Sequence, residues 1–496
     1  KISLGDRSTG MYLINAENIN NAGGQITSES GATKNVGIYA INGSVDKGST
    51  KDNTAYNKAQ NYKTLNMITA TNITLGNGSV GLYSKGQSIS TKNIVTNTGN
   101  ITVGKEIVEN VNTPNEKKYP AVAMYAENTK LDTNSTAIVG ENGLVFYGKN
   151  SDIIGKGTAN FNNKGTLAYL DKSNFTAYYG DLTANQKTML FVKDSIATLN
   201  GLGPKIDITV NDKLVATKDA FAGVYVEGKS YLNGVKKITV GRNSNGIFLK
   251  DAIFTSNVDD IISTKERAKG LLALNSNLTT NSKINLSGEN SIGIYSEADS
   301  GNTVVNNGEL TLSGKQTLGV FLKGTHTFEN KANINIANSS DSTKPTIGIY
   351  TANTQDVRDG SGNIIATNIL NSTNIKHSFG IIEVGEKSIG IYSKTSANVD
   401  IDGGKIHVKD QGIGIYKEAG KLTIKGELDI DTHIATTKDS EPTGVYAVNG
   451  AYIDDQSSKI SVGAKSYGFI LNNTDSTKTN IYTNTGVGSV AMGNDS

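Results

Sequence analysis

The chain has 496 residues, 48 of them basic and 46 acidic, and its net charge of +2 gives no general field for attracting nucleic acid or an anionic membrane. It has no cysteine, which excludes disulfides and thiolate metal sites. Its four arginines are too few for bidentate base readout, and it has no run of 18 apolar residues that would form a transmembrane helix, so we expect no nucleic-acid partner and no membrane span.

Taken in chain order, the predicted elements are short strands that repeat the triplet Gly, aliphatic residue, Tyr or Phe. Clear copies begin at Gly10, Gly37, Gly81, Gly223, Gly246, Gly293, Gly319, Gly348, Gly390, Gly414 and Gly444, and looser copies at Ala123, Val145, Ala168, Gly270 and Gly468. The copies at 223, 246, 270 and 293 are separated by 23, 24 and 23 residues. Larger gaps, such as 37 to 81, correspond either to two coils or to one coil with an insertion.

A second strand precedes many of these triplets. It alternates apolar and polar residues, as in KITVG and KISVG, and it ends near a glycine that stands five residues before the triplet glycine. These upstream glycines are Gly76, Gly241, Gly288, Gly314, Gly385 and Gly463. The repeating unit is therefore strand, glycine turn, strand and polar connection.

A period of this length, built from short strands without any helical periodicity, indicates a solenoid. We predict an all-β fold, a right-handed parallel β-helix with roughly 18–20 coils of about 23 residues, as one segment spanning 1–496. We expect the aliphatic residue of each triplet to point into the core, and Gly and Tyr to share the opposite face. The aromatic residues would then stack as a ladder, which includes Tyr39, Tyr83, Tyr225, Tyr295, Tyr350, Tyr392, Tyr416 and Tyr446. Whether this ladder faces inward or outward stays open.

The repeat also explains a match to a nucleotide-binding motif. GVYVEGKS at 223–230 fits G-x-x-x-x-G-K-[ST], but its middle is a predicted strand and no helix signal follows. A phosphate-binding loop needs a helix N-terminus after it. We therefore interpret the match, and the G-x-G-x-x-G match at 76–81, as products of the repeat.

Few residues are suited to catalysis or metal binding. The four histidines (His326, His377, His407 and His433) are far apart in the sequence, and each is expected to be a surface residue rather than a ligand. The best candidate for a polysaccharide-cleaving pair is LDIDTH, with Asp429, Asp431 and His433, although an exposed polar face is the favoured interpretation. We expect no enzyme, no cofactor and no metal.

Function in a solenoid is concentrated on insertions and exposed faces. The period is interrupted at about 41–70, 104–120 and 351–378, and the coils at about 180–222 are irregular. Aromatic, amide and charged side chains in such loops suit sugar or protein contact. The candidate binding residues are Tyr56, Tyr62, Lys63, Glu116, Lys117, Lys118, Arg358 and Asp359.

The phrases SIGIYSEA, TIGIYTAN, SIGIYSK, GIGIYKEAG and TGVYAVNG, with KI-x-V strands before them, resemble the passenger region of large fusobacterial type V autotransporter adhesins over essentially the whole chain. The resemblance implies a β-helical passenger displayed on the bacterial cell surface, and a role in coaggregation and virulence. The implied partners are a host-cell glycan or protein receptor, or other bacteria. Such proteins also carry a signal peptide and a C-terminal outer-membrane barrel. This chain shows neither, so contact with the membrane would depend on a barrel outside it.

Three functions follow as hypotheses. The first is an adhesin segment that displays binding loops or faces on a rigid β-helix. The second is a passive stalk or spacer whose binding domain lies elsewhere. The third, less favoured because the carboxylates fall mainly in turns, is a polysaccharide-active enzyme on the same scaffold.

Overall fold

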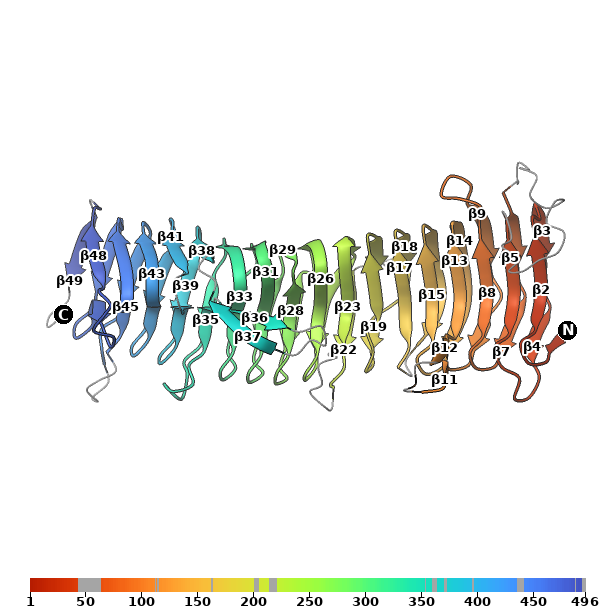
Figure 1. Cartoon of the computed structure of the whole chain (residues 1–496), viewed down its shortest axis with the longest axis horizontal. Helices are drawn as coiled ribbons and strands as arrows, with labels where there is room; N and C mark the ends of the chain where they lie inside the picture. The colour runs from red at the N-terminus through yellow and green to blue at the C-terminus, as the bar shows by residue number, and fades with distance from the viewer. Residues whose placement is uncertain are drawn as a thin grey trace. The chain divides into compact units, whose positions relative to one another are not determined.

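The structure is a computed structural model that describes the chain except residues 43–63, 112, 114–115, 162–163, 200–204, 214–220, 353, 359–363, 370–372, 395–396, 435–440, 487 and 493–496, and that describes only the backbone at 354–358, 364–369 and 489. The chain forms two compact units, the first from 1–209 and 221–236 and the second from 210–220 and 237–496. Each unit is described by itself. In both, the described regular structure is β-strand, wound as stacked parallel coils of a β-solenoid (Figure 1).

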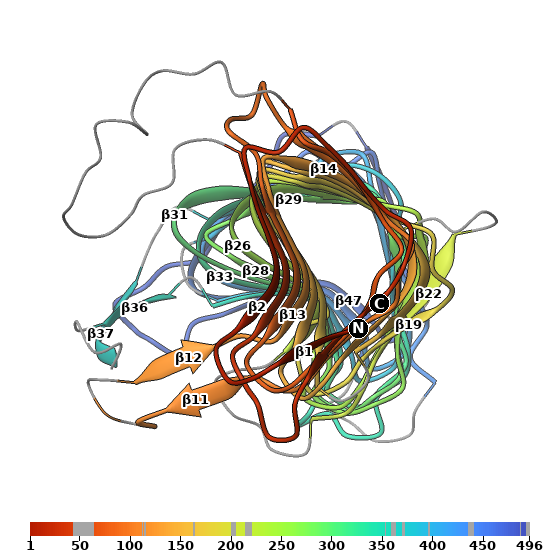
Figure 2. The ribbon, with the colours of Figure 1, turned by 90° about the vertical axis from the view of Figure 1, so that its right-hand side faces the viewer.

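Unit 1 begins at the N-terminus and is built from short strands and a few longer ones. Its strands are β1 (Ile2–Leu4), β2 (Thr9–Ile14), β3 (Asn18–Asn21), β4 (Gln25–Ser28), β5 (Val36–Ile41), β6 (Asn66–Thr69), β7 (Asn72–Leu75), β8 (Val80–Lys85), β9 (Asn93–Asn97), β10 (Ile101–Val103), β11 (Ile107–Glu109), β12 (Lys117–Tyr119), β13 (Val122–Glu127), β14 (Thr129–Val139), β15 (Leu144–Lys149), β16 (Asp152–Asn160), β17 (Thr166–Asp171), β18 (Asn174–Ala177), β19 (Leu182–Ala184), β20 (Leu190–Lys193), β21 (Ile196–Leu199), β23 (Ala222–Lys229) and β24 (Tyr231–Asn233). Viewed from its N-terminal end, the coils of this unit lie over one another around a common interior (Figure 2).

Unit 2 repeats the same plan, and two further strands, β22 (Ile206–Val210) and β25 (Val235–Val240), have residues in both units. Its strands are β26 (Asn245–Ser256), β27 (Asp260–Ser263), β28 (Lys269–Leu274), β29 (Asn277–Thr280), β30 (Lys283–Leu286), β31 (Ile292–Asn306), β32 (Leu310–Leu312), β33 (Leu318–Asn330), β34 (Ile334–Ile336), β35 (Ile347–Thr351), β36 (Thr354–Arg358), β37 (Ile364–Ile369), β38 (Asn374–His377), β39 (Ile381–Val384), β40 (Ile389–Ser393), β41 (Asn398–Ile401), β42 (Lys405–Val408), β43 (Ile413–Ile424), β44 (Glu427–Ile430), β45 (Thr443–Asp455), β46 (Lys459–Val462), β47 (Tyr467–Asn472), β48 (Ile481–Asn484) and β49 (Ser489–Met492).

The triplet strands pair in register, so each copy of the triplet lies beside the next. Tyr125 pairs with Tyr147, which pairs with Tyr169, and both steps are 22 residues. The longer gaps are single coils with an insertion, because Tyr39 pairs directly with Tyr83 and Tyr350 with Tyr392. The solenoid therefore has about 16 turns rather than the 18–20 expected. Its hand stays a prediction.

The aliphatic residue of each triplet lies in the core, as expected. Ile38, Val224 and Ile391 are fully buried, and so are their counterparts Ile247, Ile294, Val320, Ile349, Ile415 and Val445. The following aromatic residue points the other way and is half-buried on the outer surface. The aromatic ladder is therefore an external feature of the solenoid.

The triplet glycine does not share the face of the aromatic residue, so that expectation was wrong. Glycines such as Gly37 are skipped in the strand register, and a Cβ there would lie 2.8 Å from a methyl group of the core residue Ile73. It would also lie 2.5 Å from the carbonyl oxygen of Gly81 in the next coil. Gly37 and Ile38 are successive buried residues, so strict alternation fails here. Only glycine lets consecutive coils approach so closely.

The polar corners explain why the chain is rich in asparagine. The side-chain oxygen Oδ1 of Asn72 accepts a hydrogen bond from the backbone N–H of Asn100 (2.9 Å), and Oδ1 of Asn100 accepts one from the backbone N–H of Thr136 (3.0 Å). Other asparagines, including Asn128, Asn150 and Asn275, occupy left-handed backbone conformations at the turn after the triplet strand. Asparagine tolerates that conformation better than most side chains, so it serves both positions.

Candidate functional site

The insertion at 104–120 forms an antiparallel hairpin, β11 with β12, that projects outward beside the triplet strands of unit 1 (Figure 2). Lys34 holds it in place, because its ammonium group forms an ion pair with Glu109 and lies 4.1 Å from the centroid of the Tyr119 ring. The Lys34 side chain is 10% exposed. The ion pair holds the pKa of Glu109 below its ordinary value, chiefly through the hydrogen bond from Lys34. The hairpin is thus anchored to the solenoid at its base.

Three predicted binding residues lie on this hairpin. Lys117 and Lys118 are exposed in β12, and Lys118 forms an ion pair with Glu116 (3.2 Å). Lys118 also comes within electrostatic range of Lys187, a residue distant in sequence. Burial lowers the pKa of Lys187, the charge of Glu106 opposes that shift, and the charge of Lys118 adds to it. The hairpin therefore places charged side chains above neighbouring coils.

The other predicted binding residues are not brought together in the described structure. Tyr56, Tyr62, Lys63 and Asp359 lie outside the described residues. Arg358 ends β36, which pairs antiparallel with β37 in the insertion between β35 and β38, and only its backbone is described. Their role in binding stays a prediction.

The outer face of the triplet strands carries the aromatic ladder as a stack of parallel rings. In unit 1 the ring centroids of Tyr83 and Tyr125 are 4.5 Å apart with an interplanar angle of 11°, and those of Tyr125 and Tyr147 are 4.5 Å apart at 6°. The stack extends from Tyr12 through Tyr39 to these rings and on to Tyr169. Unit 2 has a similar stack at Tyr350, Tyr392, Tyr416 and Tyr446. The ring faces are thus occupied by neighbouring rings.

A stripe of alternating charges runs beside the rings in unit 1. Its residues are in register, two positions after each aromatic residue: Lys85, Glu127, Lys149, Asp171, Lys193 and Glu227. Neighbours form ion pairs, such as Lys193 with Glu227 at 2.7 Å and Lys85 with Glu127 at 3.6 Å. Because the stripe neutralises itself, it offers no net charge to a ligand.

The acidic residues of LDIDTH each lie beside a basic side chain. Asp429 receives a hydrogen bond from Lys405 (2.7 Å), and Asp431 lies 3.0 Å from Nε2 of His407. His433 instead contacts Asp410 through Nδ1 (2.8 Å). Each side chain is thus bonded to a residue on the preceding coil, which agrees with the polar-face interpretation. That the chain is not an enzyme stays a prediction.

The histidines divide into two kinds, and the expectation that all lie on the surface was wrong for two of them. His326 and His377 are fully buried in polar columns inside the coils, where His326 bonds Ser296 (2.9 Å) and His377 bonds Asn330 (3.1 Å). Burial lowers the pKa of His326 to about 4 and also lowers that of His377. The sequence signal is positional, because Asn330 and His377 occupy the same place in successive coils.

His407 is half-exposed and lies between two carboxylates, with Nδ1 2.7 Å from Glu383 and Nε2 3.0 Å from Asp431. Burial lowers its pKa, but the hydrogen bonds to Asp431 and Glu383 outweigh burial and raise the pKa above the ordinary value. Both ring nitrogens are already engaged. Within the described ranges, no group of three or more His, Asp or Glu side chains is arranged to hold a metal ion.

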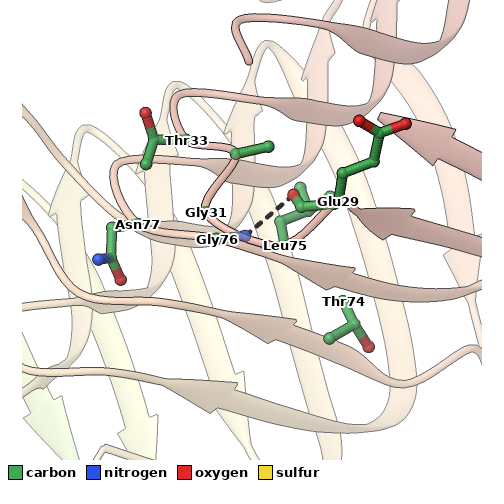
Figure 3. Close-up of a pocket in the computed structure, with 9 residues that line it drawn as sticks. Glu29, Gly31, Thr33, Thr74, Leu75, Gly76 and Asn77 are labelled. Carbon is green, nitrogen blue, oxygen red and sulfur yellow. Dashed lines mark hydrogen bonds between the residues drawn. The ribbon is translucent and has the colours of Figure 1, made fainter. Parts of the chain in front are cut away.

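One depression lies between the turns that follow β4 and β7, with a volume of about 330 Å³ (Figure 3). Its lining residues are Ser28, Glu29, Gly31, Ala32, Thr33, Thr74, Leu75, Gly76 and Asn77. The N–H of Gly76 donates to Oγ of Ser28 (3.0 Å), which ties the two turns together. Glu29 is its one charged lining residue, and it contains none of the predicted binding residues. We assign it no role.

The sequence missed one rung of the ladder. Phe191 occupies the aromatic position between Tyr169 and Tyr225, although the triplet there is Met-Leu-Phe and lacks glycine. Its distance of 22 residues from Tyr169 is the signal that could have identified it. The interval at 180–222 thus contains ordinary coil strands, including β19, β20 and β21.

The GVYVEGKS stretch lies in β23 except for its last residue, Ser230, and β24 follows it, so the described structure has a strand where a phosphate-binding loop would need a helix. In the part of the chain that is described, no helix has the length and hydropathy needed to cross a bilayer.

Comparison of the chain with protein families, with curated proteins and with solved structures gives no match. The chain is a β-solenoid, and its function must be argued from its own surface.

Proposed function

We propose that this chain is a segment of a bacterial cell-surface adhesin of the autotransporter type, in which the β-solenoid displays binding elements to host cells or other bacteria. The observation that supports it best is the β11–β12 hairpin. It interrupts an otherwise regular coil, and it is fixed to the solenoid by Lys34. A loop held in a defined position loses little conformational entropy when it binds, and this favours affinity.

The fusobacterial origin, the surface location and the roles in coaggregation and virulence belong to the same proposal and rest on the resemblance of the repeat phrases. The partner would be a glycan or a protein receptor. The exposed Lys117 and Lys118, with Glu116 beside them, suit hydrogen bonds to hydroxyl or carboxylate groups.

The test is binding of the labelled protein to a glycan array and to intact epithelial cells, with galactose and N-acetylgalactosamine as competitors. The key variant is Lys117→Glu with Lys118→Glu, which reverses two charges on the hairpin. The matched control is Lys283→Glu, an exposed lysine of β30. Binding that the double variant lowers at least tenfold and the control leaves unchanged would support the hairpin as a contact. If neither variant changes the binding, the ligand contacts a different insertion.

A passive spacer is the second candidate, and the self-neutralised charge stripe favours it. A surface whose ion pairs are satisfied and whose ring faces are stacked has few groups left for a ligand. In this case the protein would bind neither the array nor the cells. The enzyme hypothesis is the weakest, because Asp429 and Asp431 are each paired with a basic side chain.

A further inference from the structure

The tyrosine stack of unit 1 has a geometry that suits a reaction between neighbouring rings. In unit 1, six consecutive rings from Tyr12 to Tyr169 lie within 4.5–5.5 Å of their neighbours. The interplanar angles in this run are 1–13°. Because the rings extend from in-register positions of parallel strands, the same carbon atoms of successive rings lie near one another.

The composition directs oxidation to these rings. The chain has neither cysteine nor tryptophan, so tyrosine is its most easily oxidised aromatic side chain. The stacked tyrosines are half-buried, except Tyr12, which is exposed, so a soluble oxidant can reach them. Some of the hydroxyl groups also have a carboxylate that can accept the phenolic proton: Tyr125 donates to Glu127 (3.2 Å) and Tyr295 donates to Glu297 (2.9 Å).

We propose that the stack is a site of oxidative cross-linking, in which a one-electron oxidant joins tyrosines of successive coils as dityrosine. Each of two phenols gives one electron to the oxidant and its hydroxyl proton to a carboxylate or water. The two phenoxyl radicals then form a carbon–carbon bond between ring positions next to the hydroxyl groups. Each ring finally regains its aromaticity as the hydrogen on the bonded carbon leaves as a proton and the ring oxygen takes one up. In total, two tyrosines lose two electrons and two protons, and two oxidant molecules are reduced. The product is a covalent link between coils.

The chain contains its own internal controls. Phe191 separates Tyr169 from Tyr225, and Phe321 separates Tyr295 from Tyr350. Phenylalanine cannot form a phenoxyl radical, so the linked pairs must end at these positions. Tyr231 is 45% exposed and lies on β24 outside the stack. Dityrosine formed at Tyr231 therefore measures how much cross-linking results from solvent exposure without stacking.

The experiment treats the folded protein with photogenerated tris(bipyridyl)ruthenium(III) as the oxidant and persulfate as the terminal electron acceptor. Dityrosine is followed by its fluorescence, and linked peptides are identified by mass spectrometry. We expect links within single molecules between stack neighbours such as Tyr83 with Tyr125 and Tyr392 with Tyr416. Tyr125→Phe should abolish both pairs that contain residue 125. Phe191→Tyr should create new links to Tyr169 or Tyr225.

The controls separate the stack from simple accessibility. Tyr231→Phe should leave the yield within about 10% of the parent value, and unfolding in urea before oxidation should lower the yield of neighbouring pairs at least fivefold. The proposal is overturned if the links join separate molecules, if they occur mainly at Tyr231, or if no dityrosine forms. It is also overturned if Phe191→Tyr folds but adds no link. Because Phe191→Tyr adds a group, its result stands even if Tyr125→Phe is poorly folded.

Discussion

Lys417 donates a hydrogen bond from Nζ to Oγ of Ser393, 3.2 Å away, inside the core of unit 2. The lysine side chain is fully buried, and it also donates to the carbonyl oxygen of Ala397. Its position in the triplet strand is occupied by Ala447 in the next coil. A buried amine is costly to charge because it loses its contact with water. Burial therefore lowers the pKa of Lys417 to about 7.

Replacing Lys417 with Met should therefore stabilise the protein. The unfolded lysine binds a proton up to its ordinary pKa of 10.5, whereas the folded one releases it near pH 7. The parent protein thus gains stability as the pH rises from about 7 to 10.5, and the charged amine destabilises it fully below pH 7. We expect Lys417→Met to raise the free energy of unfolding by about 2–4 kcal/mol at pH 6 and by less at pH 9.5. Urea unfolding at both pH values measures this, with Lys425→Met, a change of an exposed lysine, as the control.

The His407 contacts predict the opposite dependence on pH. Their net effect is to raise the pKa of His407, so the stability they contribute is fully present below pH 6.5 and is lost as the pH rises through the folded pKa. His407→Gln should remove this dependence and cost about 0.5–1 kcal/mol at pH 5.5, since the group is partly solvated. The measurement is the difference in unfolding free energy between variant and parent from pH 5.5 to 8.5. A constant difference would show that the ion pairs do not govern stability.

The close approach of coils at the triplet glycines predicts a large effect from one methyl group. A Cβ at Gly390 would lie 2.5 Å from the carbonyl oxygen of Gly414 and 2.9 Å from a methyl group of Val384. Gly390→Ala should destabilise unit 2 by about 1–3 kcal/mol. Gly180 is the matched control, because nothing lies within 4 Å of a Cβ there. The measurement is the melting temperature. Equal melting temperatures for both variants and the parent protein would contradict this prediction.

The anchoring of the β11–β12 hairpin can be tested apart from any binding. Lys34→Met removes the ion pair to Glu109 and the contact with the Tyr119 ring. We expect hydrogen exchange in 105–119 to increase at least tenfold, while the coil strands keep their protection. Lys164→Met is matched to it, because Lys164 has the same left-handed backbone conformation (φ 55° against 57°) and forms an ion pair with Glu141, a residue outside β11 and β12. Equal exchange in the two variants would show that Lys34 is not the anchor.

The repeat made most of the fold predictable. A triplet that recurs with a nearly constant period fixes the register, so the sequence alone places Tyr39, Tyr83 and their counterparts in one ladder. The face of the triplet glycine was not predictable in this way, because strict alternation does not allow for two successive buried residues such as Gly37 and Ile38. Apart from the recurring glycine itself, nothing in the sequence indicates that the backbones of neighbouring coils approach closely at this position.

Individual departures from the repeat were harder to predict. Lys417 and His377 are polar residues at buried positions, and their burial depends on partners in other coils, such as Ser393 and Asn330. For the candidate site, the sequence predicted only the residue range of the insertion and not its contacts. The hairpin at 104–120 was expected as an insertion, but its attachment to Lys34 joins residues 75 positions apart, and no local pattern signals that contact.

The in-register pairing of neighbouring coils means that the molecule can change length by whole coils. Gly390 and Gly414 occupy equivalent positions, since Ile391 pairs with Ile415. Deleting 391–414 would join Gly390 directly to Ile415 and bring β39 to β44, each a strand of the same alternating type. Duplication or loss of such a segment in the gene would therefore lengthen or shorten the protein without a new fold. The number of coils in such a solenoid can therefore change during evolution without changing the ligands that its insertions bind.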